Sequence, residues 1–173
     1  MNLPNKLTIA RIIAVPFFIA TYMLDMRIIA LVIFILASLT DMLDGKIARK
    51  YNLVTNFGKI MDPLADKILV YAAFCLMVAD QTIPAWTLVI ILFREFLVAG
   101  VRTVAASEGI VIAADMAGKI KTVLQMFAVC VLIIRPYHMI LGYIGYALFY
   151  AALVMTIYSG FNYVVKNKEV FKN

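Results

Sequence analysis

Long apolar stretches separated by short polar segments run along the whole chain. About 20 residues make one membrane-spanning helix, so a chain of 173 residues has room for six or seven of them. Short polar segments such as 25–27 and 80–82 are typical of turns between antiparallel helices. The pattern predicts six helices, at Ile12–Leu24, Ile28–Arg49, Lys59–Ala79, Ile83–Ala106, Met116–Ile134 and Met139–Val165.

The composition excludes an ordinary soluble domain. Hydrophobic residues make up 65% of the chain, charged residues make up 15%, and the mean hydropathy is +0.97. Soluble domains are closer to half apolar and a quarter charged. Cys75 and Cys130 lie in apolar runs without metal-ligand spacing, so they indicate neither a disulfide framework nor a zinc site. We expect an all-α integral membrane protein, with six transmembrane helices in a single domain over residues 1–173.

The basic residues are distributed unevenly between the two sides of the predicted bundle. The net charge is +6, but Lys and Arg are scattered among apolar runs. This favours an anionic membrane surface or an anionic substrate over nucleic acid. If the N-terminus is cytoplasmic, fourteen of the sixteen Lys and Arg residues fall on that side, and only Arg27 and Arg135 do not. The bias predicts a multi-pass cell-membrane protein with both termini and its chemistry in the cytoplasm.

Four aspartates are expected to meet near the cytoplasmic boundary. At about 100° per residue, Asp41 and Asp44 share one face at the end of the second predicted helix. Asp62 and Asp66 lie one turn apart at the start of the third. Consecutive helices joined by a short loop are antiparallel neighbours, so the two pairs arrive at the same depth. Four carboxylates can therefore converge.

Such a cluster needs cations, because mutual repulsion would raise the carboxyl pKa values or separate the helices. Oxygen ligands suit Mg²⁺ or Mn²⁺, and two such ions are the usual clamp for displacement at phosphorus. Solvated helix ends are the simpler interpretation of single aspartates, and a divalent-cation transport path is another. A transport path should continue across the bilayer, whereas these acids stop at its cytoplasmic third. Gly45 and Ala48 on the same face leave space for a ligand or for close helix packing.

The acidic segment resembles the signature of a known family. The string Asp41-x2-Asp44-Gly45-x2-Ala48-Arg49-x8-Gly58-x3-Asp62-x3-Asp66 is similar to that of the CDP-alcohol phosphotransferases at all eight fixed positions. The resemblance implies six transmembrane helices, a homodimer and a CDP-linked lipid donor. The segments 4–11, 94–95 and 118–122 further resemble one branch, the bacterial phosphatidylglycerophosphate synthases.

This resemblance implies roles for individual residues. Asp41, Asp44, Asp62 and Asp66 would bind two divalent cations, Mg²⁺ or Mn²⁺, and Asp66 would also act as general base on the acceptor hydroxyl. Asn5, Thr8 and Thr55 are further candidates for nucleotide contacts, although ordinary loop or cap hydrogen bonds would also explain them. The complete set expected to bind the CDP donor is Asn5, Thr8, Gly45, Ala48, Arg49, Thr55 and Gly58.

The acceptor should bind through cations that the donor does not need. Arg94 lies deep in an apolar stretch, so either Glu95 or an anionic acceptor is expected to pair with it. Some of the other cations could instead be anchors at the membrane surface. Together with the branch resemblance, a cationic pocket implies transfer of the phosphatidyl group from CDP-diacylglycerol to sn-glycerol 3-phosphate; inositol phosphate, serine and phosphatidylglycerol are the alternative acceptors. The candidate acceptor residues are Arg94, Arg102, Lys119 and Lys121.

Overall fold

The structure is a computed structural model, and it describes residues 3–50, 56–107, 109, 112 and 115–168. The side chains of residues 3, 4, 41–50, 56–60, 62, 63 and 66 are not described. Within the described residues the chain forms six α-helices, one short 3-10 helix and no strand. The helices are α1 (Leu3–Met23), α2 (Arg27–Lys50), α3 (Asn56–Ala79), α4 (Ala85–Ser107), α5 (Met116–Ile133) and α6 (Met139–Lys166), with the 3-10 helix at Arg135–Tyr137.

The predicted helices agree with the structure within three residues, except at the start of α1. That helix begins at Leu3, whereas the apolar pattern placed its start at Ile12. The pattern was wrong because polar residues interrupt it, yet several of them lie on the buried face of the helix. Thr8 is fully buried, and Arg11, expected at the cytoplasmic boundary, is 2% exposed and donates from Nε to the Ala37 carbonyl of α2 at 3.2 Å.

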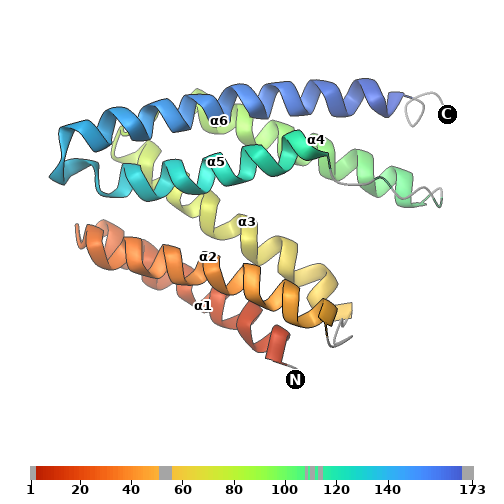
Figure 1. Ribbon diagram of the computed structural model, residues 1–173, viewed down its shortest axis with the longest axis horizontal. Coiled ribbons are helices and arrows are strands. Elements are labelled where there is room, and N and C mark those ends of the chain that lie inside the picture. Colours follow the sequence, from red (N-terminus) through yellow and green to blue (C-terminus); the bar gives the residue numbers. More distant parts are fainter. Residues whose placement is uncertain (1–2, 51–55, 108, 110–111, 113–114, 169–173) are drawn as a thin grey trace.

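The helices form an up-and-down bundle (Figure 1). α1 and α2 pair as one hairpin, α5 and α6 pair as another, and α3 crosses between them while α4 packs on α6. The start of α1 and the end of α6 lie at one end of the molecule, together with the ends of α2 and α4 and the starts of α3 and α5. The three other turns, around residues 25, 81 and 136, lie at the opposite end. We call the end with the start of α1 and the end of α6 the loop end, and we call the opposite end the turn end.

Aromatic side chains pack between neighbouring helices in the core. Phe18 of α1 lies 5.8 Å from Phe34 of α2 between ring centroids, and Phe74 of α3 lies 5.7 Å from Phe149 of α6. All four rings are fully buried. Helices in a bilayer associate through close packing and polar contacts, because lipid is as apolar as the side chains it would replace. Tight aromatic packing therefore holds α1 against α2 and α3 against α6.

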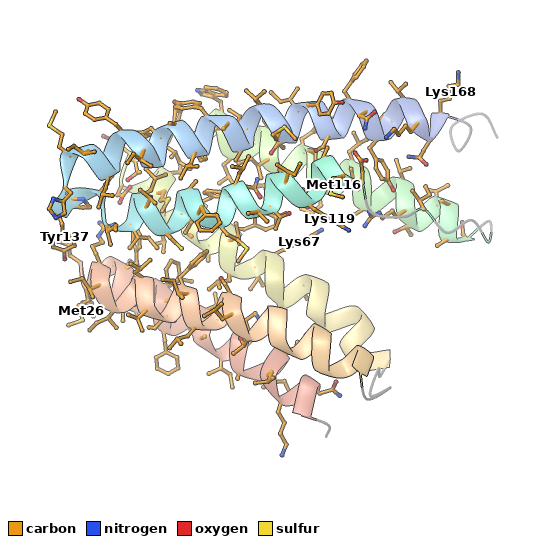
Figure 2. The ribbon with its side chains drawn as sticks, in the orientation of Figure 1. Met26, Lys67, Met116, Lys119, Tyr137 and Lys168 are labelled. Atoms are coloured by element: carbon orange, nitrogen blue, oxygen red, sulfur yellow. The ribbon has the colours of Figure 1, made fainter. Side chains whose placement is uncertain are left out.

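The outer surfaces of the helices are apolar, as expected for a membrane protein. Three described helices are long and apolar enough to cross a membrane, over Asn5–Met23, Met116–Ile133 and Met139–Lys166. Side chains project from the outside of the bundle (Figure 2). The exposed large apolar residues include Phe93, Phe96 and Phe161. In α4, by contrast, three charged residues interrupt the apolar run, and two of them are buried.

Asp80 ties three helices together at the turn end. Its carboxylate accepts hydrogen bonds from Tyr22 Oη of α1 at 2.8 Å and from the Thr82 amide at 3.0 Å, and it pairs with Arg27 Nη1 of α2 at 3.2 Å. Burial raises the pKa of the Asp80 carboxyl, but the hydrogen bonds from Thr82, Tyr22 and Arg27 outweigh burial and hold the pKa below its usual value. We call Tyr22, Arg27, Asp80 and Thr82 the Asp80 cluster.

Candidate functional site

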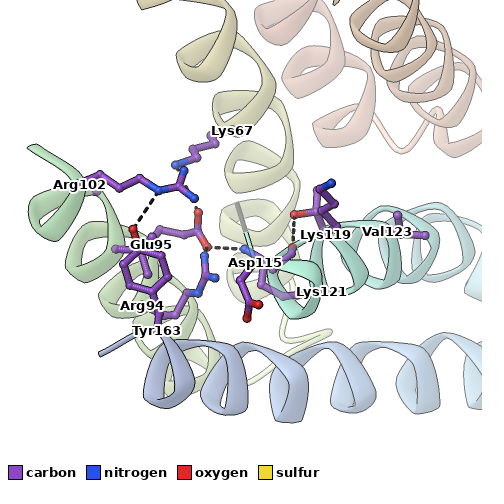
Figure 3. Close-up of a pocket in the computed structure, with 13 residues that line it drawn as sticks. Lys67, Arg94, Glu95, Arg102, Asp115, Lys119, Lys121, Val123 and Tyr163 are labelled. Atoms are coloured by element: carbon purple, nitrogen blue, oxygen red, sulfur yellow. Dashed lines mark hydrogen bonds and ion pairs between the residues drawn. The ribbon is translucent and has the colours of Figure 1, made fainter. Parts of the chain in front are cut away.

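A cavity of about 480 Å³ lies among α3, α4, α5 and α6 (Figure 3). Its size is within the ordinary range of small-molecule sites, about 300–1,000 Å³. Five cationic side chains and two carboxylates line it, which leaves a formal surplus of three positive charges. In surroundings this apolar, such a surplus favours an anionic ligand. The charged lining residues are Lys67, Arg94, Glu95, Arg102, Asp115, Lys119 and Lys121.

Glu95 is at the centre of the charged residues. Its Oε1 pairs with Arg94 Nη1 at 2.8 Å and with the ammonium of Lys121, and its Oε2 lies 3.3 Å from Lys67 Nζ. The four residues come from α3, α4 and α5. Buried charges are tolerated when they are paired and hydrogen-bonded. Glu95 thus accounts for the two cations buried at this depth, Arg94 and Lys121. We call these four residues the Glu95 cluster.

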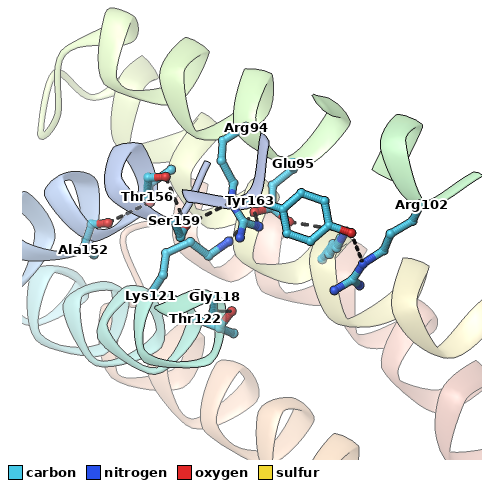
Figure 4. Close-up of polar contacts among 11 residues, drawn as sticks. Arg94, Glu95, Arg102, Gly118, Lys121, Thr122, Ala152, Thr156, Ser159 and Tyr163 are labelled. Carbon is cyan, nitrogen blue, oxygen red and sulfur yellow. Dashed lines mark hydrogen bonds and ion pairs between the residues drawn. The ribbon is translucent and has the colours of Figure 1, made fainter. Parts of the chain in front are cut away.

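Arg94 is held by small residues of the neighbouring helices (Figure 4). Its Nε donates to Ser159 Oγ of α6 at 3.1 Å, and Ser159 donates in turn to the Thr156 carbonyl. A Cβ added at Gly118 of α5 would lie 3.1 Å from Arg94 Nη2, and one added at Gly160 of α6 would lie 3.0 Å from its Cγ. The two glycines therefore provide the space through which the arginine side chain passes.

The remaining charged residues lie nearer the loop end. Arg102 is exposed, and its Nε donates to the hydroxyl of the buried Tyr163 at 3.1 Å (Figure 4). Lys119 is exposed and forms no ion pair with any side chain that the structure describes. Asp115, which precedes α5, accepts a hydrogen bond from Asn162 at 3.1 Å and lies 3.5 Å from Lys166 Nζ. Two of the cations are therefore accessible to a ligand that enters from this side.

The structure brings all four predicted acceptor residues, Arg94, Arg102, Lys119 and Lys121, to this one cavity. Arg94 pairs with Glu95, which is one of the two partners considered for it. Lys121 is buried against Glu95, so it is not an anchor reaching toward the membrane surface.

Sequence reasoning missed Lys67, Asp115 and Tyr163 as lining residues. Lys67 could have been found from its place directly after Asp66 at the start of an apolar run. Asp115 looks like an ordinary helix cap in sequence, but its side chain makes no cap hydrogen bond to the described backbone of α5. It contacts α6 instead.

The predicted donor and metal residues are described only in part. Asn5 and Thr8 are buried on α1. Asp41, Asp44, Gly45, Ala48 and Arg49 belong to the last turns of α2, and Gly58, Asp62 and Asp66 belong to the first turns of α3. Their side chains, and all of Thr55, lie outside the described residues. Their roles remain predictions, although the backbone places both groups toward the loop end, where the cavity's Lys67 follows Asp66.

The chain is similar to known proteins over most of its length. A sequence model of the CDP-alcohol phosphatidyltransferase family matches residues 1–158. The chain therefore belongs to the CDP-alcohol phosphatidyltransferase family.

Among curated relatives, the chain is 41% identical to the CDP-diacylglycerol–glycerol-3-phosphate 3-phosphatidyltransferase of Bacillus subtilis (strain 168), over 99% of this chain and 97% of that protein. A protein of the same name from Rickettsia bellii (strain RML369-C) is 40% identical over 98% and 97%. Another, from Shigella flexneri serotype 5b (strain 8401), is 36% identical over 94% and 93%.

Proposed function

We propose that the protein is an enzyme that transfers the phosphatidyl group of CDP-diacylglycerol to sn-glycerol 3-phosphate, giving phosphatidylglycerophosphate and CMP. Near full-length similarity to relatives of that activity supports the reaction. The cavity is the observation that supports the choice of acceptor. It brings together the four cations predicted from the sequence, and its lining carries a surplus of positive charge. Serine carries no phosphate, so it would leave this surplus without a partner.

The cations of the cavity suit a phosphomonoester. A phosphate monoester carries a charge of about −1.5 to −2 at pH 7 and presents three acceptor oxygens. Arg94 supplies a planar set of donors, while Lys121 and Lys67 supply compact charges. Exposed Arg102 and Lys119 would attract the acceptor from the cytoplasm before Arg94 and Lys121 bind it at depth.

The metal site is assigned to Asp41, Asp44, Asp62 and Asp66, with Asp66 also as general base. A donor set made only of carboxylates fits Mg²⁺ or Mn²⁺, and the family membership supports a divalent cation. When bound, two such cations would neutralise the pyrophosphate of the donor and stabilise CMP as leaving group. Gly45, Ala48, Arg49 and Gly58, with Asn5, Thr8 and Thr55, are assigned to the CDP group.

The chemical step is a displacement at phosphorus. Asp66 takes the proton of an acceptor hydroxyl, whose oxygen attacks the phosphorus that carries the diacylglycerol. A bond forms between that phosphorus and the glycerol oxygen, and the bond to the CMP oxygen breaks, so CMP leaves with the electron pair. The terminal phosphate of the acceptor is unchanged and remains on the product.

We infer that all six helices span the membrane, with both termini and the cavity on the cytoplasmic side of the cell membrane. The common placement of the start of α1 and the end of α6 at the loop end supports this topology, as does the strong bias of basic residues toward that side. A cytoplasmic cavity would give a water-soluble acceptor direct access while the donor's acyl chains stay in the bilayer. The homodimer implied by the family resemblance is part of the same proposal.

Purified protein in micelles that contain labelled CDP-diacylglycerol and Mg²⁺ tests this function. Each acceptor is offered separately: sn-glycerol 3-phosphate, inositol phosphate, serine and phosphatidylglycerol. We expect CMP release with glycerol 3-phosphate, and loss of that release in Asp66→Asn because the base is removed. Absence of CMP release with glycerol 3-phosphate, in protein that releases CMP with another acceptor, would overturn the proposed acceptor.

A further inference from the structure

We propose that Glu95 is a positioning residue, which holds Lys67, Arg94 and Lys121 in the arrangement that receives the acceptor's phosphate. The inference rests on the proposed function, and it concerns a carboxylate in a cavity that otherwise favours anions. A carboxylate there repels an anionic ligand, so its place at the centre of the cations calls for an explanation. The two carboxylate oxygens of Glu95 contact different cations, and these contacts explain its position.

The two oxygens of Glu95 connect three helices. Oε1 pairs with Arg94 of α4 and Lys121 of α5, both buried, and Oε2 pairs with Lys67 of α3 at 3.3 Å. The side chains of Arg94 and Lys121 are only 11% and 4% exposed, whereas that of Lys67 is 42% exposed. One oxygen therefore holds the deep part of the cation set, and the other holds the part that faces the opening.

These pairs leave donors for a ligand. An ammonium group has three N–H donors, and a guanidinium group has five. Glu95 accepts one hydrogen bond from Lys121 and one from Arg94 and forms an ion pair with Lys67, while Ser159 accepts the Nε–H of Arg94. Lys67 and Lys121 each retain two N–H groups that Glu95 does not use, and Arg94 retains three. The same cations can thus contact Glu95 and three phosphate oxygens together.

Glu95 also keeps the cations in place before the acceptor arrives. Three positive charges this close would repel each other, and buried charges without a partner are costly. With Glu95 present, the site is already arranged for an anion, so less ordering is required on binding. Lys67 connects this set of cations to the proposed general base, because it directly follows Asp66 on α3. An acceptor phosphate held by the Glu95 cluster is consequently kept near the proposed base.

Steady-state kinetics of Glu95→Gln and Glu95→Asp test the role. The Gln variant keeps the shape of the side chain and removes its charge, so we expect KM for glycerol 3-phosphate to rise about 10-fold or more, the scale of one charge-assisted hydrogen bond. KM for CDP-diacylglycerol should not change. Glu95→Asp restores the charge on a shorter side chain, and its acceptor KM should fall between those of the wild type and the Gln variant. Asp80→Asn is the matched control, with the same chemical change at the turn end and no effect on either KM.

A double-mutant cycle keeps the test independent of the stability of one variant. Lys67→Met removes the more exposed partner, and its effect on the acceptor KM should be smaller than that of Glu95→Gln. If Glu95 acts by holding Lys67, the two effects together should be less than multiplicative in the double variant. Fully multiplicative effects would contradict the proposal.

Other results would also overturn it. A lower acceptor KM in Glu95→Gln would show that Glu95 weakens phosphate binding and does not position the cations for it. A lower melting temperature with unchanged KM would show a role in stability alone. The wild type is assayed first, because absence of CMP release with glycerol 3-phosphate contradicts the proposed function, whereas normal release with an unchanged KM in Glu95→Gln contradicts only the role of Glu95.

Discussion

Two carboxylates organise polar groups in this bundle, Asp80 at the turn end and Glu95 beside the cavity. Both join three helices, and both contact an arginine. The charges around them differ. Near Asp80, Arg27 is paired with two acids, because it also contacts Asp25 at 2.7 Å. Around Glu95, three cations share a single carboxylate.

The difference distinguishes a structural contact from the proposed binding site. The Asp80 cluster satisfies its own charge at a turn between helices, where each ion pair contributes little. The Glu95 cluster keeps more positive charge than it neutralises, and it does so next to a cavity. A protein has no structural reason to bury excess cations, since their desolvation is unfavourable. The surplus of cations over carboxylates in the Glu95 cluster is therefore a better indication of an anionic ligand than its number of ion pairs.

The largest expected effect comes from removing an arginine at each cluster. Arg94→Met should raise the acceptor KM about 30-fold, because a hydrogen bond from a charged donor to phosphate contributes about 2 kcal/mol. Arg27→Met should change that KM less than about 2-fold and reduce the free energy of unfolding by less than about 1 kcal/mol. Steady-state kinetics and thermal unfolding in detergent measure both. Equal KM changes in the two variants would remove the distinction between the clusters.

A smaller effect on the acceptor KM is expected from adding a methyl group beside Arg94. In Gly118→Ala the new Cβ would lie 3.1 Å from Arg94 Nη2. Displacement of that guanidinium should raise the acceptor KM about 5-fold, or about 1 kcal/mol, with little change in stability.

Gly145→Ala is the matched control near the turn end. There the new Cβ would meet Leu132 Cδ2 at 2.8 Å and the Leu132 backbone nitrogen at 3.3 Å, where α5 and α6 pack together. We expect a loss of about 1–3 kcal/mol in the free energy of unfolding from overpacking, with the acceptor KM unchanged. If Gly145→Ala raised the acceptor KM as much as Gly118→Ala, the effect could not be assigned to Arg94.

The smallest effect concerns pH and Asp80. Its pKa in the folded protein is below the unfolded value of 3.8, so the ionised carboxylate stabilises the fold above that value. This contribution is lost as the pH falls through the lower folded pKa. Asp80→Asn should lower the melting temperature by about 2–4 °C at pH 7, and the difference from wild type should shrink below about pH 4. A difference that stays constant down to pH 3 would exclude the charge of Asp80 as its source.

Much of the fold followed from the sequence, because helix boundaries depend on local apolar runs. Five helices lay within three residues of their predicted ends. The start of α1 did not, since Thr8 and Arg11 look like surface residues in a hydropathy pattern but are buried in the bundle. Burial of a polar residue depends on what faces it, as the contact of Arg11 with the Ala37 carbonyl shows.

The candidate acceptor site, too, could be predicted from the sequence only in part. Arg94, Arg102, Lys119 and Lys121 could be selected from the sequence because charges are costly and rare in apolar stretches. Their convergence on one cavity, and the addition of Lys67, Asp115 and Tyr163, could not.

The sequence by itself determined the class of protein, the number of helices and the residue types available for phosphate chemistry, because each depends on local composition and spacing. Only the tertiary structure decided which charges meet. Glu95 contacts Lys67 and Lys121, residues on two other helices and more than 25 positions away in each direction. Helical periodicity assigns a residue to a face of its own helix, but the neighbour of that face is set by the packing of the whole bundle.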